Sequence, residues 1–256
     1  MKNFNWRVLN FSINCASMNM AIDEAIFRCY DEVNTIRFYG WKPSAVSIGK
    51  HQRISEEVNL NSLQELNFDC VRRISGGGAV FHDETGELTY SIVTNLHNIE
   101  TDTIEGNYYR ILEIIFHPLE KLGLSIDYGQ IHCPSVFSKG KKISGNAQAR
   151  YKDIILQHGT ILTKFRPEIM YSVLKAHEGR TRESMIESVY QHVTTLTESL
   201  NKDISPQNVA EYLIRYLTET TFPQSYLGEL TDEEQQMATE LASEKYESKN
   251  WLYKYL

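Results

Sequence analysis

Apolar and polar residues alternate most regularly between Glu87 and Thr94. Leu88, Tyr90 and Ile92 alternate there with Thr89 and Ser91, the period-2 pattern of a strand with one buried face. Similar patterns predict strands over 6–13, 35–39 and 45–48, and further strands between 125 and 163. These stretches together predict a sheet that supplies much of the core.

Helical spacing follows between the strands. Over 18–30, apolar residues recur every three or four positions, which predicts an amphipathic helix. A second helix is predicted over 108–122, with a kink at Pro118 because proline lacks the amide donor. Proline or capping signals predict three later helices, over 167–175, from Ser205 onward, and from the capping box at Thr231 to about Ser248.

This order of elements predicts an α+β fold with a mixed or antiparallel sheet flanked by helices. We expect a single domain over 1–256, with its core at about 6–175 and a helical C-terminal portion at about 176–256. The segment 180–203 is interpreted as a connector, with a mobile lid as the alternative.

Composition excludes several function classes. Twenty-six basic and thirty-three acidic residues give a net charge of -7, which argues against nonspecific nucleic-acid binding. The four cysteines are scattered without the spacing of a zinc site. No apolar signal core or membrane-length apolar run occurs, so we predict a soluble cytoplasmic protein without a membrane partner.

The most distinctive stretch runs from Arg72 to Asp83 and contains three consecutive glycines, Gly76 to Gly78. Glycines suit neither helix nor strand, so a loop is predicted, whose backbone N–H groups are able to approach an anionic ligand. Arg72 and Arg73 add two charges that suit phosphate or carboxylate, although an exposed surface turn is the simpler alternative. Neither the Walker A pattern nor Gly-x-Gly-x-x-Gly occurs, so a nucleotide would be held in another way.

A second chemical stretch runs from Gly140 to Gln148, with Lys141 and Lys142 at the head of a predicted strand. Consecutive strand residues point to opposite faces, so at most one of these lysines faces a given ligand. Without further context, such a pair is simply a solvated strand end.

Together with 157–160 (Gln-His-Gly-Thr), these two stretches resemble the lipoate-protein ligase family, within the biotin and lipoate ligase fold, which is class II synthetase-like. Segments 19–25, 37–39 and 47–52 look like the family's early motifs in the expected order. The resemblance covers about 6–175, and the chain is similar to the short archaeal-type members that lack the large ligases' C-terminal domain.

The resemblance implies a ligase that activates lipoic acid with ATP to lipoyl-AMP and then transfers the lipoyl group to a lysine of a lipoyl domain. Lys142 would be the catalytic residue, because its positive charge offsets the repulsion between a carboxylate and the α-phosphate. The residues implied in substrate and ATP binding are Arg72, Arg73, Ser75, Gly76, Gly77, Gly78, Ala79, His82, Asp83, Gly145, Asn146, Gln148, His158 and Gly159.

The implied cofactors and partners follow from that reaction. Mg²⁺ would bridge the phosphates, although the sequence does not identify its ligand; Asp83 and Asp153 are candidates. The implied acceptor is the lipoyl domain of a 2-oxoacid dehydrogenase acyltransferase subunit, the glycine cleavage H protein, or both. A separate small accessory subunit is expected to replace the absent domain.

Cys133 raises an alternative. A sister branch of the fold transfers octanoyl groups from acyl carrier protein through a cysteine thioester, and Cys133 lies in the corresponding region, next to His132. Against the transferase, Gly78 stands where that branch is expected to carry arginine, and the spacing from Cys133 to Pro134 is shorter. A non-catalytic acyl or lipoyl-domain binding module is a second alternative, disfavoured by Lys142 and both arginines. Biotin ligation fits less well, because the glycine loop lacks interleaved arginines.

Overall fold

The computed structural model describes residues 5–99, 101, 103–129, 135–176 and 179–255. Its central sheet has the strand order β11-β12-β7-β3-β1-β13, with β2 added beside β3. The strands are β1 (Trp6–Leu9), β2 (Ser12–Asn14), β3 (Asn34–Trp41), β7 (Glu87–Asn95), β11 (Asn146–Tyr151), β12 (Ile154–Leu162) and β13 (Tyr226–Gly228). β3, β7, β12 and β11 pair antiparallel, whereas β1 is parallel to both β3 and β13, so the prediction of a mixed sheet is confirmed.

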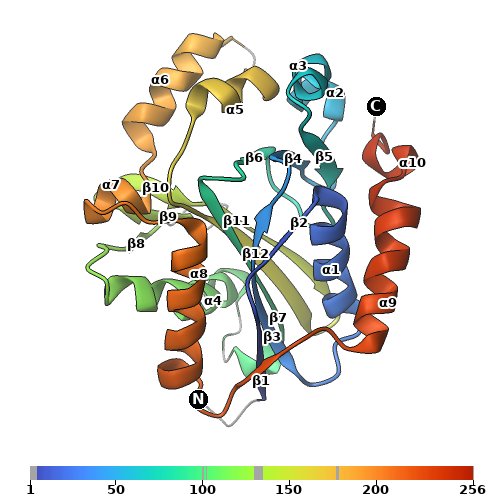
Figure 1. Cartoon of the computed structure of the whole chain (residues 1–256), viewed down its shortest axis with the longest axis vertical. Helices are drawn as coiled ribbons and strands as arrows, with labels where there is room; N and C mark the ends of the chain where they lie inside the picture. The colour runs from blue at the N-terminus through green and yellow to red at the C-terminus, as the bar shows by residue number, and fades with distance from the viewer. Residues whose placement is uncertain (1–4, 100, 102, 130–134, 177–178, 256) are drawn as a thin grey trace.

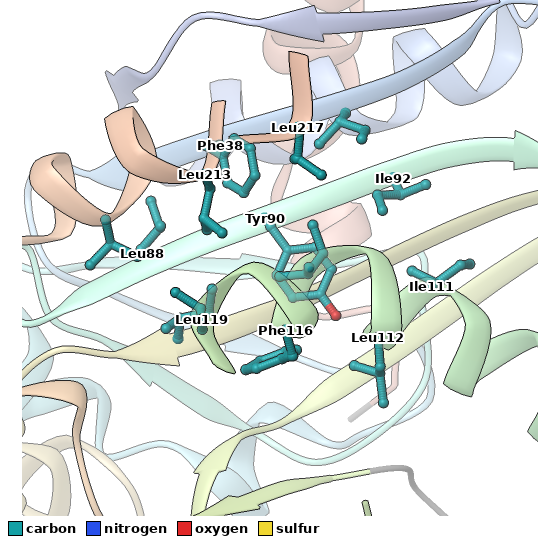
Figure 2. Packing of buried hydrophobic residues seen from close by; sticks show 14 of the residues in the cluster. Phe38, Leu88, Tyr90, Ile92, Ile111, Leu112, Phe116, Leu119, Leu213 and Leu217 are labelled. Atoms are coloured by element: carbon teal, nitrogen blue, oxygen red, sulfur yellow. The ribbon is translucent and has the colours of Figure 1, made fainter. Parts of the chain in front are cut away.

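One face of this sheet is covered by α4 (Ile104–Glu120) and α8 (Pro206–Tyr216). Figure 2 shows Leu88, Tyr90 and Ile92 of β7 meeting apolar side chains from both helices. Pro118 lies in the last turn of α4, where its ring nitrogen has no N–H to donate to the carbonyl four residues earlier. The alternation of β7 thus places its polar residues, Glu87, Thr89 and Ser91, on the opposite face.

That opposite face is covered by α1 (Ala16–Arg28) and α9 (Asp232–Leu241), which lie side by side (Figure 1). The capping box predicted at Thr231 is present, with Glu234 as its second member. A π-helical segment, Ala242–Tyr246, and α10 (Lys249–Leu252) continue α9. The end of the chain therefore returns to the face that carries the polar residues of β7.

Two small sheets border the central one. The first has the order β5-β4-β6, from β4 (Ala45–Ile48), β5 (Asp69–Arg72) and β6 (Val80–His82), and the helices α2 (Ile54–Glu57) and α3 (Leu60–Glu65) follow β4. The second has the order β10-β9-β8, from β8 (Asp127–Tyr128), β9 (Val136–Ser138) and β10 (Lys141–Ser144). The triple-glycine segment, predicted to be a loop, connects β5 to β6.

Two predictions of local structure were wrong. The stretch 6–13 forms two strands, β1 and β2, which pair with different parts of β3. The segment 180–203, interpreted as a connector, contains α6 (Arg182–His192) and α7 (Leu196–Leu200), after α5 (Pro167–Val173). α6 buries only Met185 among its described residues, so it has no apolar stripe; its signal is the capping residue Thr181. None of the helices in the described ranges has the length and apolarity that a membrane span requires.

Candidate active site

Arg73 lies at the centre of the glycine loop. Its Nη2 donates to the carbonyl oxygens of Gly76, at 2.8 Å, and Gly78, at 2.7 Å. Its Nη1 donates to the carbonyl of Ser47 at 3.1 Å. Gly77, between the two bound carbonyls, has a φ of +90°, a backbone conformation that residues other than glycine rarely adopt. The loop is therefore folded around a buried guanidinium.

Arg72 points the other way, as expected for neighbouring residues at a strand end. Its guanidinium donates to the carbonyls of Trp251 and Leu252 near the C-terminus and to those of Gly49, Lys50 and Gln52. Trp251 returns a hydrogen bond from its Nε1 to the Arg72 carbonyl at 2.7 Å. Arg72, which the resemblance assigned to the ligand site, thus holds the end of the chain instead.

A first cavity of about 200 Å³ lies between the glycine loop, the polar face of the central sheet and β10. Many of the predicted site residues line it, namely Arg73, Gly77, Gly78, Ala79, His82, Lys142, Gly145, Asn146, His158 and Gly159. Met20, Tyr39 and Trp41 add apolar and aromatic surface. Residues from three separate stretches of the sequence therefore meet around one small, largely apolar space.

His158 is held on one wall of the first cavity by a buried hydrogen-bonded chain. Its Nε2 is 2.6 Å from Ser75 Oγ, and its Nδ1 is 3.2 Å from Asp23 Oδ2. Burial alone would raise the pKa of Asp23, but the hydrogen bond from His158 and the charge of Arg37 lower it below its usual value. Ser75 is only 1% exposed and does not line the cavity, so the chain orients His158 and offers no serine nucleophile.

His82 is held by a second chain of the same kind. Its Nε2 is 2.8 Å from Ser47 Oγ, its Nδ1 is 2.6 Å from Glu87 Oε1, and Thr89 also donates to that oxygen. The Trp41 ring stacks on the imidazole with centroids 3.9 Å apart. Both histidines therefore present fixed ring edges to the cavity. Sequence reasoning identified the histidines but missed Asp23, Trp41 and Glu87, because their roles depend on how α1 and the strands pack together.

Lys142 stands between the first cavity and a second one of about 400 Å³. The two cavities share Gly78–Val80, Lys142, Gly145 and Thr160. Lys141, on the other face of β10, is half-buried and its Nζ donates to the carbonyl of Tyr190 at 3.0 Å. Of the two lysines, Lys142 lines both cavities and Lys141 lines neither.

The walls of the second cavity are mainly apolar, with cations at Lys164, Arg166 and Lys175. Asp83 lies here and binds Arg166 through two hydrogen bonds of 2.5 and 2.7 Å. Burial would raise the pKa of Asp83, but the bonds from Arg166 and Thr85 lower it. Asp153 lies in the turn between β11 and β12, outside both cavities. Over the described ranges no group of three or more His, Cys, Asp or Glu is placed to hold a metal.

The remaining predicted residues divide between the cavities and their surroundings. Asn146 lines the first cavity and accepts a hydrogen bond from the Tyr90 hydroxyl at 2.5 Å. Gln148 lies outside both cavities and bonds Gln157 at 2.6 Å. Gly76 holds the loop through its carbonyl without lining a cavity. Cys133 falls outside the described residues.

Comparison with known proteins places this chain in a family. The sequence model of one protein family, the lipoyl protein ligase A/B catalytic domain, matches residues 15–218. The chain belongs to this family. It is 32% identical to octanoyltransferase LipM of Brevibacillus brevis, over 96% of the chain and 98% of that relative. It is 29% identical to octanoyltransferase LipM of Bacillus subtilis, over 99% of the chain and 100% of that relative.

Solved structures with the same fold are lipoate ligases. The bipartite lipoate-protein ligase of Thermoplasma acidophilum, from a study of that enzyme and its E2 lipoyl domain, has a TM-score of 0.83 at 29% identity and covers 99% of the chain and 98% of its own. Lipoate-protein ligase A bound with ATP has a TM-score of 0.81 at 28% identity, and the match covers 98% of the chain and 100% of that ligase. The predicted fold and family are confirmed, and the chain is an enzyme of the lipoate ligase and octanoyltransferase family.

Proposed function

We propose that the chain transfers an octanoyl group from the thioester of an acyl carrier protein to a lysine of a lipoyl domain, with Cys133 as the nucleophile. The observation that carries the acyl specificity is the first cavity. Its volume of about 200 Å³ lies below the range of about 300–1,000 Å³ typical of drug-sized ligands, so it suits a slim, medium-length chain. The choice of a thioester donor is supported by relatives named octanoyltransferase that match almost end to end.

The reaction divides into two acyl transfers. The Cys133 thiolate attacks the thioester carbonyl, and the carrier leaves as its thiol after taking up a proton. The acceptor lysine, as a neutral amine, then attacks the cysteine thioester, forming the amide, losing a proton and releasing Cys133. A cysteine thiol has a reference pKa of about 8.5, so a cation near it would enlarge its thiolate fraction.

Lys142 supplies a charge at the point where both cavities meet. At neutral pH its ammonium group stabilises negative charge that develops on the acyl carbonyl oxygen during either attack. His158 and His82, each fixed by a carboxylate and a serine, keep the cavity wall rigid, so that the acyl carbonyl is held in one place. This function requires no nucleotide and no metal.

ATP-dependent lipoate ligation is the second candidate, and the likeness to a ligase bound with ATP favours it. Under this candidate lipoic acid would occupy the first cavity and ATP the second, whose lysines and arginine suit phosphate. A separate small subunit would then be needed for full activity. The acceptor under either candidate is a lipoyl domain, from a 2-oxoacid dehydrogenase or the glycine cleavage H protein.

Intact mass measurement of an isolated lipoyl domain separates the two candidates. We expect octanoyl-acyl carrier protein to modify it without ATP, and Cys133→Ala to abolish this modification. The matched control is Cys70→Ala, because burial raises the pKa of the Cys70 thiol to about 12 and keeps it protonated. Modification that requires lipoic acid, ATP and Mg²⁺ and survives Cys133→Ala would establish the ligase. Repeating that arm with candidate accessory proteins tests the need for a second subunit.

A further inference from the structure

We infer that the second cavity receives the phosphopantetheine arm of the acyl carrier protein, and that Lys175 binds the phosphodiester of this arm. The inference rests on the proposed function and names the part of the site that recognises the octanoyl donor. An acyl carrier protein holds its acyl group as a thioester at the end of a long arm, which is joined to the protein by a single phosphodiester. A site for this donor therefore needs a channel beside the acyl cavity and a cation at the outer end of that channel.

The second cavity supplies such a channel. It joins the first cavity at Lys142, beside which the thioester carbonyl lies in the proposed transfer. Its walls include Met170 of α5 and Val189 of α6, two helices that pack against each other (Figure 1). Its volume of about 400 Å³ lies within the range of about 300–1,000 Å³ typical of drug-sized ligands. A long arm therefore fits there while the acyl chain fills the first cavity.

The charges around the second cavity suit one phosphodiester better than a triphosphate. The lining contains four cations and three carboxylates, namely Lys142, Lys164, Arg166 and Lys175 with Glu57, Asp83 and Glu87. Two of the cations already have carboxylate partners: Arg166 binds Asp83, and Lys164 binds Asp203 at 2.8 Å. The surplus of one positive charge matches the single negative charge of a phosphodiester, whereas a triphosphate would bring several more negative charges than this lining balances.

Lys175 differs from Lys164 and Arg166 because it forms no ion pair within the described ranges. It is exposed to solvent although it lines the second cavity, so it lies at the opening. Its backbone N–H donates to the carbonyl of Glu57 at 2.9 Å, and its Nζ donates to the carbonyl of Ser55 at 2.7 Å. These bonds fix the lysine at the end of α2. Because an ammonium group has three donors, Nζ is able to bind a phosphate oxygen as well.

The same charges disfavour the acceptor lysine as the occupant of the second cavity. That lysine is positively charged before it loses its proton, so a surplus of cations repels it. Arg182 strengthens this preference, because its exposed guanidinium donates to the carbonyl of Tyr171, which lines the cavity. The whole chain carries a net charge of -7, so the basic opening departs from the overall charge and attracts an anionic group. The donor arm, which is long and anionic, is therefore the better fit.

The direct test compares the S-octyl thioethers of phosphopantetheine and pantetheine, which lack a carbonyl and therefore cannot react. Calorimetry measures both affinities. We expect the wild type to prefer the phosphorylated compound about tenfold or more, because a hydrogen bond between charged groups contributes about 1.5–3 kcal/mol. In Lys175→Ala the preference should fall to about threefold or less. Lys121→Ala, at an exposed lysine outside both cavities, should keep the full preference. A wild type without the preference, or a Lys175→Ala variant that retains it, would overturn the site.

A second test asks which substrate Lys175 serves. In Lys175→Ala we expect KM for octanoyl-acyl carrier protein to rise about tenfold and KM for the lipoyl domain to stay within about twofold, because only the donor carries the phosphodiester. A rise confined to the lipoyl domain, or equal rises for both substrates, would show that Lys175 does not recognise the donor. Absence of octanoyl transfer by the wild type would refute the proposed function, while the calorimetric comparison would still decide on the phosphodiester site.

Discussion

Arg72 and Arg73 are adjacent, almost fully buried and bound mainly to carbonyl oxygens, yet they organise different regions. Arg72 joins β5 to the end of the chain and to the loop at 49–52, whereas Arg73 folds the glycine loop against the first cavity. Five donors in a rigid fork make arginine suited to collecting several carbonyls at once. An Arg-Arg pair beside glycines is therefore as consistent with arginines that hold backbone carbonyls as with arginines that bind an anionic ligand.

The Arg72 region gives the largest expected effect on stability. Arg72→Ala removes hydrogen bonds to five carbonyls, and each buried acceptor left without a partner costs about 1–3 kcal/mol. We expect the free energy of unfolding in urea to fall by about 4 kcal/mol or more. Arg53→Ala, which breaks an exposed pair with Glu56, should change it by less than about 0.5 kcal/mol. Similar values for the two variants would contradict the role given to Arg72.

Gly49 tests the second region, the glycine loop held by Arg73, because it lies against that loop. A Cβ on Gly49 would lie 2.0 Å from the Gly77 carbonyl oxygen, a backbone atom that cannot simply rotate away. Gly49→Ala should therefore lower the free energy of unfolding by about 2–3 kcal/mol and displace the glycine loop.

Gly78→Ala is the matched control, since a Cβ there meets nothing within 4 Å. Its effect on the free energy of unfolding should stay within about 0.5 kcal/mol. Equal destabilisation would show that flexibility, and not the close contact at Gly49, decides the cost. The open space at Gly78 also means that sterics do not require glycine at this position, which weakens the argument drawn from Gly78 against a transferase.

The sequence predicted the two regions unequally. Hydrophobic alternation and capping signals located most strands and helices, because burial on one face leaves a period in the sequence. The motif residues around the first cavity were predicted because they resemble those of a family. The orientations of Arg72 and Gln148 were not predictable, since both depend on which strand face meets which neighbour. Asp23, on α1, and Glu87, on β7, were missed because their histidine partners lie on other elements, β12 and β6.

Asp23 offers the smallest of these effects and the one with a pH signature. Its pKa is lower in the folded chain than the reference value of about 3.9, because the hydrogen bond from His158 and the charge of Arg37 outweigh the cost of burial. Its contribution to stability is therefore fully present above about pH 4 and is lost as the pH falls through the folded-state pKa. At pH 7, Asp23→Asn should lower the free energy of unfolding by about 1–2 kcal/mol.

That difference between wild type and Asp23→Asn should shrink as the pH is lowered from 5 to 3, because protonation removes the same charge from the wild type. Urea unfolding at each pH measures it, with Asp127→Asn, at an exposed strand residue, as the control that should differ little from wild type throughout. A difference that stays constant across this range would mean that the Asp23 carboxylate charge does not stabilise the His158 chain. The rigidity of that wall of the first cavity would then have to come from the hydroxyls of Tyr39, Ser75 and Ser91 alone.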